Sequence, residues 1–180
     1  MSIGKPALVR AKQSAISAGF QLFRSTGAHR LAARWTGGVG AILMFHRVRP
    51  WTGNGFAPNR LLEITPEFLA ETIETLRIMD FDIIGIGEAL DRLETGEEGD
   101  RRFAVLSFDD AYKDNLEYAL PVLQRKQAPF VLYAVPGFAE RTAGLWWLEL
   151  EEAIRRLDRI VLSPEAGGLC LSASNDSEKT

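Results

Sequence analysis

The sequence predicts an α/β fold in which strands and helices alternate, and two observations support this prediction. Apolar runs of strand length alternate four times with stretches whose apolar residues recur at helical spacing, between residues 39 and 158. This alternation is typical of parallel strands joined by crossover helices, the pattern of open α/β sheets and (β/α) barrels. In such folds the chemistry lies at the carboxyl ends of the strands, so residues there are the first functional candidates.

A basic amphipathic helix is predicted over residues 5–35, ahead of the first strand. Three glycines within residues 35–40 then end the helical pattern. We therefore expect a helical leader over 1–38 and an α/β part over 39–180. The residues that fall roughly on one face of the leader are Leu8, Ala11, Ala15, Ala18, Leu22 and His29, with Ile16 and Phe20 beside them.

The first two elements of the α/β part carry clear signals. Residues 39–48 form one apolar run, which predicts a strand covered on both faces. Thr65 followed by Pro66 predicts the first residues of a helix that ends near Met79. The residues expected to face inward from this helix are Phe68, Leu69, Ile73, Leu76 and Met79.

The pattern then repeats. Residues 81–86 predict a second strand, a short helix ends near Gly96, and residues 102–108 predict a third strand. The following helix contains Pro121, where it must kink or restart. A fourth strand is predicted over 129–135.

The last part of the chain departs from the alternation. A helix is predicted over 146–158, where glutamates precede arginines at helical spacing. From residue 159 onward, two short strands joined by a Gly-Gly turn are expected.

Charge and cysteine content narrow the function classes. The net charge of −3 argues against a general nucleic-acid binder. No acid precedes Glu63, whereas residues 1–62 carry nine lysines and arginines, so residues 5–35 could contact an anionic membrane surface. The single cysteine, Cys170, allows no internal disulfide. We see neither a secretory signal nor a membrane span and expect a cytoplasmic protein, peripheral to the membrane at most.

Two adjacent carboxylates, Asp109 and Asp110, follow the third predicted strand directly. Like charges repel, so such a pair needs either a cation or solvent. One interpretation is a metal ligand beside a general base, which accepts a proton from water. The other is a pair of acids that cap the following helix. The residues alone leave both open.

The stretch LSFDDAYKDNLEYALPVLQRKQAPFVLYAV resembles the first signature of the NodB-type polysaccharide deacetylases, T-F-D-D-G followed by Tyr or Pro. ILMFHRV resembles the M-Y-H-R-V stretch that opens many of these domains, ITPEFLAETIETLRIMDFDIIGIGEAL resembles their next helix and strand, and LWWLELEEAI resembles a helix of one subgroup. The matches follow in order over residues 41–158. The resemblance implies a partly opened barrel and metal-dependent removal of N-acetyl or O-acetyl groups from a polysaccharide or oligosaccharide. It also implies a divalent metal, zinc above all, with Asp109 as general base and Asp110 as metal ligand.

The sequence departs from this family in two respects. Ala111 stands where the family has Gly, which tolerates a positive φ. The family's His-x-x-x-His metal motif is also missing, because His29 and His46 are the only histidines. About four strand–helix units are predicted, fewer than a closed barrel needs. We therefore expect the N-terminal part of the domain, with weak or absent metal binding and an inactive or impaired site.

Three further candidates each have two interpretations. His46 is either a residue supporting the metal site or a structural histidine bonded to backbone. Trp146 and Trp147 either contact sugar or pack in the core. Asp114 is either a third acid of a polyphosphate site or a solvated acid in the first helical turn.

Two alternative functions remain. One is a non-enzymatic module that binds a membrane or glycan surface through the basic helix. The other is a magnesium-dependent phosphate enzyme that uses Asp109, Asp110 and Asp114, although no Lys/Gly phosphate cradle accompanies them.

Overall fold

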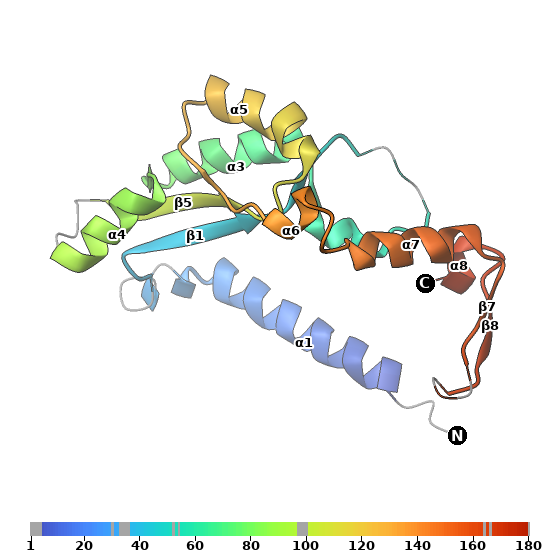
Figure 1. Ribbon diagram of the computed structural model, residues 1–180. Helices are drawn as coiled ribbons and strands as arrows, with labels where there is room; N and C mark the ends of the chain where they lie inside the picture. Colours follow the sequence, from blue (N-terminus) through green and yellow to red (C-terminus); the bar gives the residue numbers. More distant parts are fainter. Residues whose placement is uncertain are drawn as a thin grey trace. The chain divides into compact units, whose positions relative to one another are not determined.

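The computed structural model describes residues 5–29, 31–32, 37–51, 53, 55–96, 101–163, 165 and 167–179. The chain divides into two compact units, Met1–Gly40 and Ala41–Thr180. Figure 1 shows the order of the elements along the chain. No helix in the described part is both long enough and apolar enough to cross a membrane.

The first unit contains one long helix, α1 (Lys5–Ser25). It ends where Thr26 Oγ1 donates to the Leu22 carbonyl oxygen at 2.8 Å and Gly27 turns left-handed, with φ 73°. The predicted single helix over 5–35 is therefore wrong beyond Ser25. Residues 28–29 and 31–32 are helical again, and residues 30 and 33–36 lie outside the described part.

The second unit is built on a four-stranded sheet. Its strands are β1 (Gly40–Phe45), β5 (Phe103–Phe108), β4 (Asp82–Ile83) and β6 (Val131–Leu132). The order is β1-β5-β4, and β6 also pairs with β5. The β4–β5 and β5–β6 pairs are parallel, as the alternation predicts. The described sheet is open and shows no closure into a barrel.

Strand β5 lies at the centre of the core, because all six of its residues are buried. Alternate residues face opposite sides of the sheet. On one side β5 packs with α3 (Pro66–Ile78) and α5 (Leu120–Arg125), which lie side by side in Figure 1. On the other, Phe103 and Val105 pack with Ala89 of α4 (Ile86–Thr95).

Several predicted elements are confirmed. Helix α3 begins where expected, and the Thr65 hydroxyl accepts a hydrogen bond from the Phe68 backbone N–H at 3.2 Å. Its buried residues are Leu69, Ile73 and Leu76, but Phe68 and Met79 are exposed, contrary to prediction. Helix α4 ends at the left-handed Gly96, also as predicted.

The first predicted strand is wrong in length and in burial. β1 ends at Phe45, and β2 (Arg47–Val48) instead pairs in parallel with β3 (Glu63–Ile64). Leu43 and Phe45 pack on the core, whereas Ile42 and Met44 are 61% and 62% exposed. The apolar run therefore has one covered face rather than two. β4 and β6 are also shorter than predicted, with two residues each.

The segment around Pro121 stays helical without a break over residues 113–125, and its hydrogen-bond pattern changes before the proline. Residues Asn115–Ala119 form a π-helical turn, in which the Leu120 N–H donates to the Asn115 carbonyl five residues earlier. Pro121 then stands in the first turn of α5, which continues directly from the π-helical turn, and it donates no backbone hydrogen bond there.

The remaining elements follow β6. They are α6 (Pro136–Ala139), α7 (Trp146–Arg156), β7 (Arg159–Val161), β8 (Cys170–Ser172) and α8 (Asp176–Lys179). β7 and β8 pair antiparallel across the glycine turn, as predicted. Helix α7 contacts the 3-10 helix η1 (Pro58–Leu62), where Asn59 Nδ2 donates to Glu151 Oε2 at 2.7 Å. The whole is a mixed α/β structure with a parallel sheet.

Candidate active site

Asp109 lies at the carboxyl edge of the sheet, between two strand ends. Its N–H donates to the Phe45 carbonyl oxygen at 2.9 Å, next to the end of β1. Beside it, the Tyr133 N–H donates to the Phe108 carbonyl oxygen at 2.8 Å, next to the end of β6. The buried strand thus carries the first acid to an edge where three strands end.

The chain turns sharply directly after Asp109. Asp110 and Ala111 both have left-handed backbones, with φ 66° and 48°. Strand geometry ends at Phe108, so the acids do not continue the alternation of side chains along β5. Ala111 adopts the conformation that the family's Gly would take freely, at a cost of about 1–2 kcal/mol.

Neither acid is neutralised by a basic side chain of the described part. Asp109 and Asp110 are half-buried, and no ion pair within 4.0 Å involves either of them among those residues. Adjacent half-buried carboxylates of this kind favour binding of a cation.

Tyr112 directly follows the left-handed turn and is held in place by contacts with Arg47 and Trp147. Its ring is buried and lies under the Arg47 guanidinium, 4.8 Å from ring centroid to Cζ. Its hydroxyl accepts a hydrogen bond from Trp147 Nε1 at 3.0 Å. Burial raises the pKa of Tyr112, the hydrogen bond from Trp147 opposes this rise, and the charge of Asp110 adds to it. The hydroxyl therefore keeps its proton.

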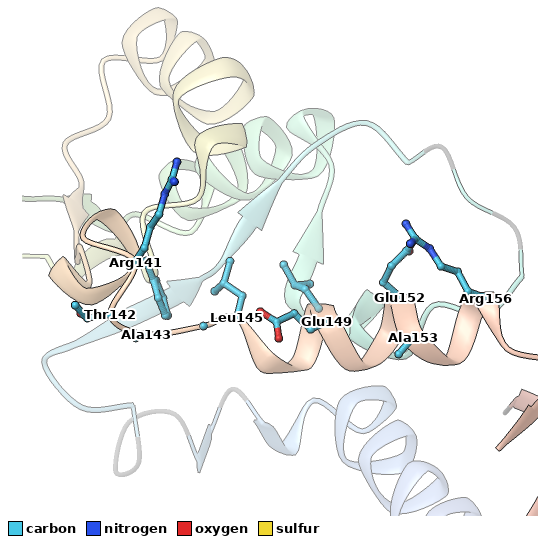
Figure 2. A pocket seen from close by; sticks show the side chains of 11 residues that line it. Arg141, Thr142, Ala143, Leu145, Glu149, Glu152, Ala153 and Arg156 are labelled. Carbon is cyan, nitrogen blue, oxygen red and sulfur yellow. The ribbon is translucent and has the colours of Figure 1, made fainter. Parts of the chain in front are cut away.

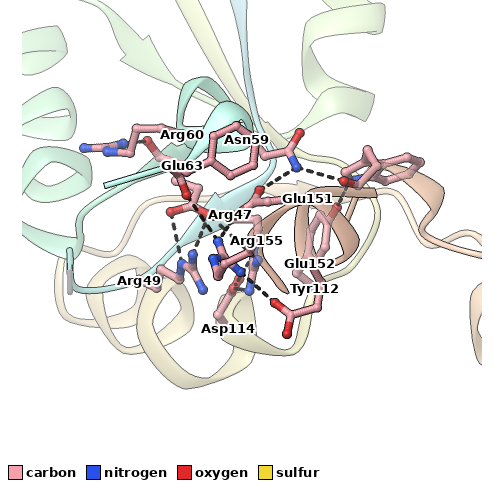
Figure 3. A network of polar contacts seen from close by, with 12 residues as sticks. Arg47, Arg49, Asn59, Arg60, Glu63, Tyr112, Asp114, Glu151, Glu152 and Arg155 are labelled. Atoms are coloured by element: carbon pink, nitrogen blue, oxygen red, sulfur yellow. Dashed lines mark hydrogen bonds and ion pairs between the residues drawn. The ribbon is translucent and has the colours of Figure 1, made fainter. Parts of the chain in front are cut away.

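A buried ionic network lies next to Tyr112 (Figure 3). Arg47 Nε and one terminal nitrogen each lie 2.7 Å from Asp114 Oδ2. Arg49 contacts Glu63 Oε1 at 2.6 Å. Asp114 is buried, so the interpretation as a solvated first-turn acid is wrong. Its second oxygen, Oδ1, has no hydrogen-bond partner in the described part.

The other sequence candidates lie around this centre. His46 is half-buried between β1 and β2, and its carbonyl oxygen accepts from Asn115 Nδ2 at 2.9 Å. Trp147 is tied to Tyr112, whereas Trp146 is exposed and does not pack in the core. The two indoles meet edge to face, with centroids 5.8 Å apart.

Sequence reasoning missed Tyr112 and Arg47 as parts of the site. Tyr112 had a usable signal, because the resembled motif continues with Tyr or Pro after the acids. Arg47 also had one, because it is the Arg of the stretch that resembles M-Y-H-R-V, but its contact with Asp114, 67 residues away in the chain, had none.

The described residues meet only part of the ligand requirement of a catalytic metal site. No group of three His, Cys, Asp or Glu residues that could hold a metal gathers anywhere in the described part. A catalytic zinc site needs three protein ligands and one open position. The described residues can therefore supply a base and one ligand, but not a complete shell.

An open groove of about 870 Å³ lies elsewhere, along α7 and the loop before it (Figure 2). Its lining comes from residues 138–156 and does not include the acid pair. Arg156 Nε donates to Glu152 Oε1 at 2.6 Å across one helical turn. This pairing leaves the charge of the groove wall largely balanced.

No protein-family model and no curated protein matches the chain. Three solved structures show partial similarity. They are the Streptococcus pyogenes deacetylase PplD in complex with acetate (18% identity, TM-score 0.48), a de-N-acetylase from Aggregatibacter actinomycetemcomitans (16%, 0.47) and IcaB from Ammonifex degensii (24%, 0.46). The matches cover 63%, 76% and 54% of this chain and 52%, 46% and 39% of those chains. The chain thus spans about half of their length or less.

Proposed function

We propose that the carboxyl end of β5 is the reacting edge of a metal-dependent deacetylase that acts on acetylated polysaccharides or oligosaccharides. The observation that carries the proposal is the acid pair itself. Asp109 and Asp110 stand on a left-handed turn where a fully buried strand ends, without a neutralising cation from the described part. The motifs that resemble the NodB-type deacetylases include the same two residues.

Each acid has a distinct role in this proposal. Asp109 accepts the proton of the water that attacks the acetyl carbon. Asp110 holds the metal, and its charge lies close enough to Tyr112 to raise the pKa of that hydroxyl. A bound divalent cation would acidify that water and polarise the acetyl carbonyl. His46 and the exposed Trp146 are candidates for support of the metal site and for sugar contact.

The first test is metal binding. We expect the 180-residue chain to bind Co²⁺ or Zn²⁺ loosely, because carboxylates alone hold such ions weakly. Replacement of Asp110 by Asn should weaken binding at least about tenfold, because it removes the charged ligand. Asp91→Asn, on the exposed side of α4, is the matched control and should bind like the wild type. Calorimetry with each metal measures the effect; unchanged affinity in Asp110→Asn would refute the site.

The second test is acetate release from acetylated chito-oligosaccharides. We expect release near background from the 180-residue polypeptide, because its described residues supply only one ligand beside the base. Tight stoichiometric metal binding with acetate release that Asp109→Asn abolishes would overturn this expectation of inactivity. It would mean that His46 or a partner chain completes the shell, and it would support the deacetylase assignment.

The magnesium-dependent phosphate enzyme has less support. It needs Asp114 beside the acid pair, but Arg47 engages Oδ2 of that carboxylate with two nitrogens. A buried Asp–Arg pair of this kind is costly to separate.

A further inference from the structure

Helix α1 has a compact apolar face that differs from the predicted alanine-rich one. Ile16, Phe20 and Phe23 follow one another at spacings of four and three residues, so they lie on the same side of the helix. Their exposed fractions are 49%, 70% and 44%. Two aromatic rings and a branched aliphatic side chain thus form a continuous exposed stripe along α1.

Basic residues border this stripe on both sides. At 100° per residue, Lys12 falls beside Ile16 and Phe23 on one side, and Arg24 falls beside Phe20 on the other. The helix contains no acid at all, and the first acid of the chain is Glu63. The far side of the helix carries small or polar residues such as Ser14 and Ala18.

We propose that α1 lies in the surface of an anionic lipid membrane, with Ile16, Phe20 and Phe23 turned into the boundary between headgroups and acyl chains. Lys12 and Arg24 border the stripe, where long basic side chains reach the headgroup phosphates while their stems cover apolar surface. All charged residues of the helix are basic, which complements the negative surface of an anionic membrane. Because the apolar stripe is short, binding should be reversible and dependent on the basic residues.

This inference is independent of the proposed function, since none of its residues belongs to the acid site. The membrane proposal concerns the surface to which the chain binds, whereas the acid pair concerns the proposed reaction. Results of the metal and acetate experiments therefore do not bear on membrane binding by α1. Results of the membrane experiments do not bear on the acid pair.

The first experiment is flotation of the full chain with vesicles of phosphatidylcholine, with or without phosphatidylglycerol. We expect binding only to the anionic vesicles, with affinity falling as salt rises. Phe20→Gln should reduce partitioning at least about tenfold, because it removes an exposed ring that the membrane would bury. Leu22→Gln is the matched control: Leu22 is also exposed but lies on another side of α1, and binding should change less than about twofold. Lys12→Gln should reduce binding about fivefold.

A second measurement remains decisive even if a Gln variant loses helix. In a Cys170→Ser background, an environment-sensitive fluorophore is attached at Ile16→Cys or, as its opposite-face control, at Ala18→Cys. Anionic vesicles should shift emission to the blue and block aqueous quenching at position 16 only. Equal responses at both positions, equal loss in Phe20→Gln and Leu22→Gln, or equal binding to neutral vesicles would each overturn the proposal. So would a dimer, seen by sedimentation, that Phe20→Gln dissociates and that does not bind vesicles.

Discussion

Ala111 is a residue where sequence and backbone conflict inside the candidate site. Its left-handed φ of 48° costs about 1–2 kcal/mol for a residue with a Cβ. Glycine removes this cost, but it also makes the unfolded chain more flexible, which destabilises the folded protein by about 0.4–1 kcal/mol. We therefore expect Ala111→Gly to stabilise the protein by about 0.5–1 kcal/mol, measured by urea unfolding.

The control for this prediction is Ala153→Gly in α7, where the same change should destabilise by about 1 kcal/mol because the backbone is helical. Loss of stability in both variants would show that the turn at Ala111 is not left-handed in solution.

The acid pair could be predicted from sequence, whereas its surroundings could not. Asp109 and Asp110 were found because they follow an apolar run directly, which is a local signal. The Arg47–Asp114 contact and the Tyr112–Trp147 hydrogen bond join residues 67 and 35 positions apart. Such contacts form only because the fold brings distant segments together. No pattern within a short stretch of sequence indicates which segments will meet.

At the scale of elements, the helix ends that carry a capping residue were predicted best. Helix α3 has its cap at Thr65, and α4 has its left-handed Gly96. β1 was predicted less well, since an apolar run does not reveal how many faces are covered. The end of α1 was missed because the sequence pattern continues past Gly27, which turns the backbone.

Helices α3 and α5 are joined by an ion pair whose effect depends on pH. Lys126 Nζ lies 2.6 Å from Glu74 Oε1, and its hydrogen bond and charge lower the pKa of Glu74 from its ordinary value. A depressed pKa of a carboxyl stabilises the fold above the unfolded-state value, and this contribution is lost as the pH falls through the folded-state value. We expect Glu74→Gln to lower the urea midpoint at pH 7, and the difference from wild type to disappear in strong acid.

Glu71→Gln is the control, because Glu71 is exposed on the same helix and no ion pair in the described residues involves it. The pH argument would be contradicted by a difference between wild type and Glu74→Gln that persists unchanged in acid.

At the scale of the whole molecule, the second unit leaves apolar strand surface uncovered. Ile42 and Met44 of β1 project from the side opposite Leu43 and Phe45, which pack on the core. Strand β1 also pairs with β5 alone among the described strands, so one of its edges is unpaired there. Exposed apolar faces and free strand edges both promote association between molecules.

We therefore expect the isolated chain to bind apolar dyes and to associate as its concentration rises. Combined Ile42→Thr and Met44→Thr changes should reduce dye fluorescence and shift sedimentation toward the monomer, because Thr is polar and its β-branched side chain suits a strand. Leu61→Thr provides the control, because Leu61 is 95% exposed on η1 and stands apart from the sheet. A monodisperse wild-type monomer that melts cooperatively and binds no dye would contradict this prediction, since it would require that another segment covers the β1 face in solution.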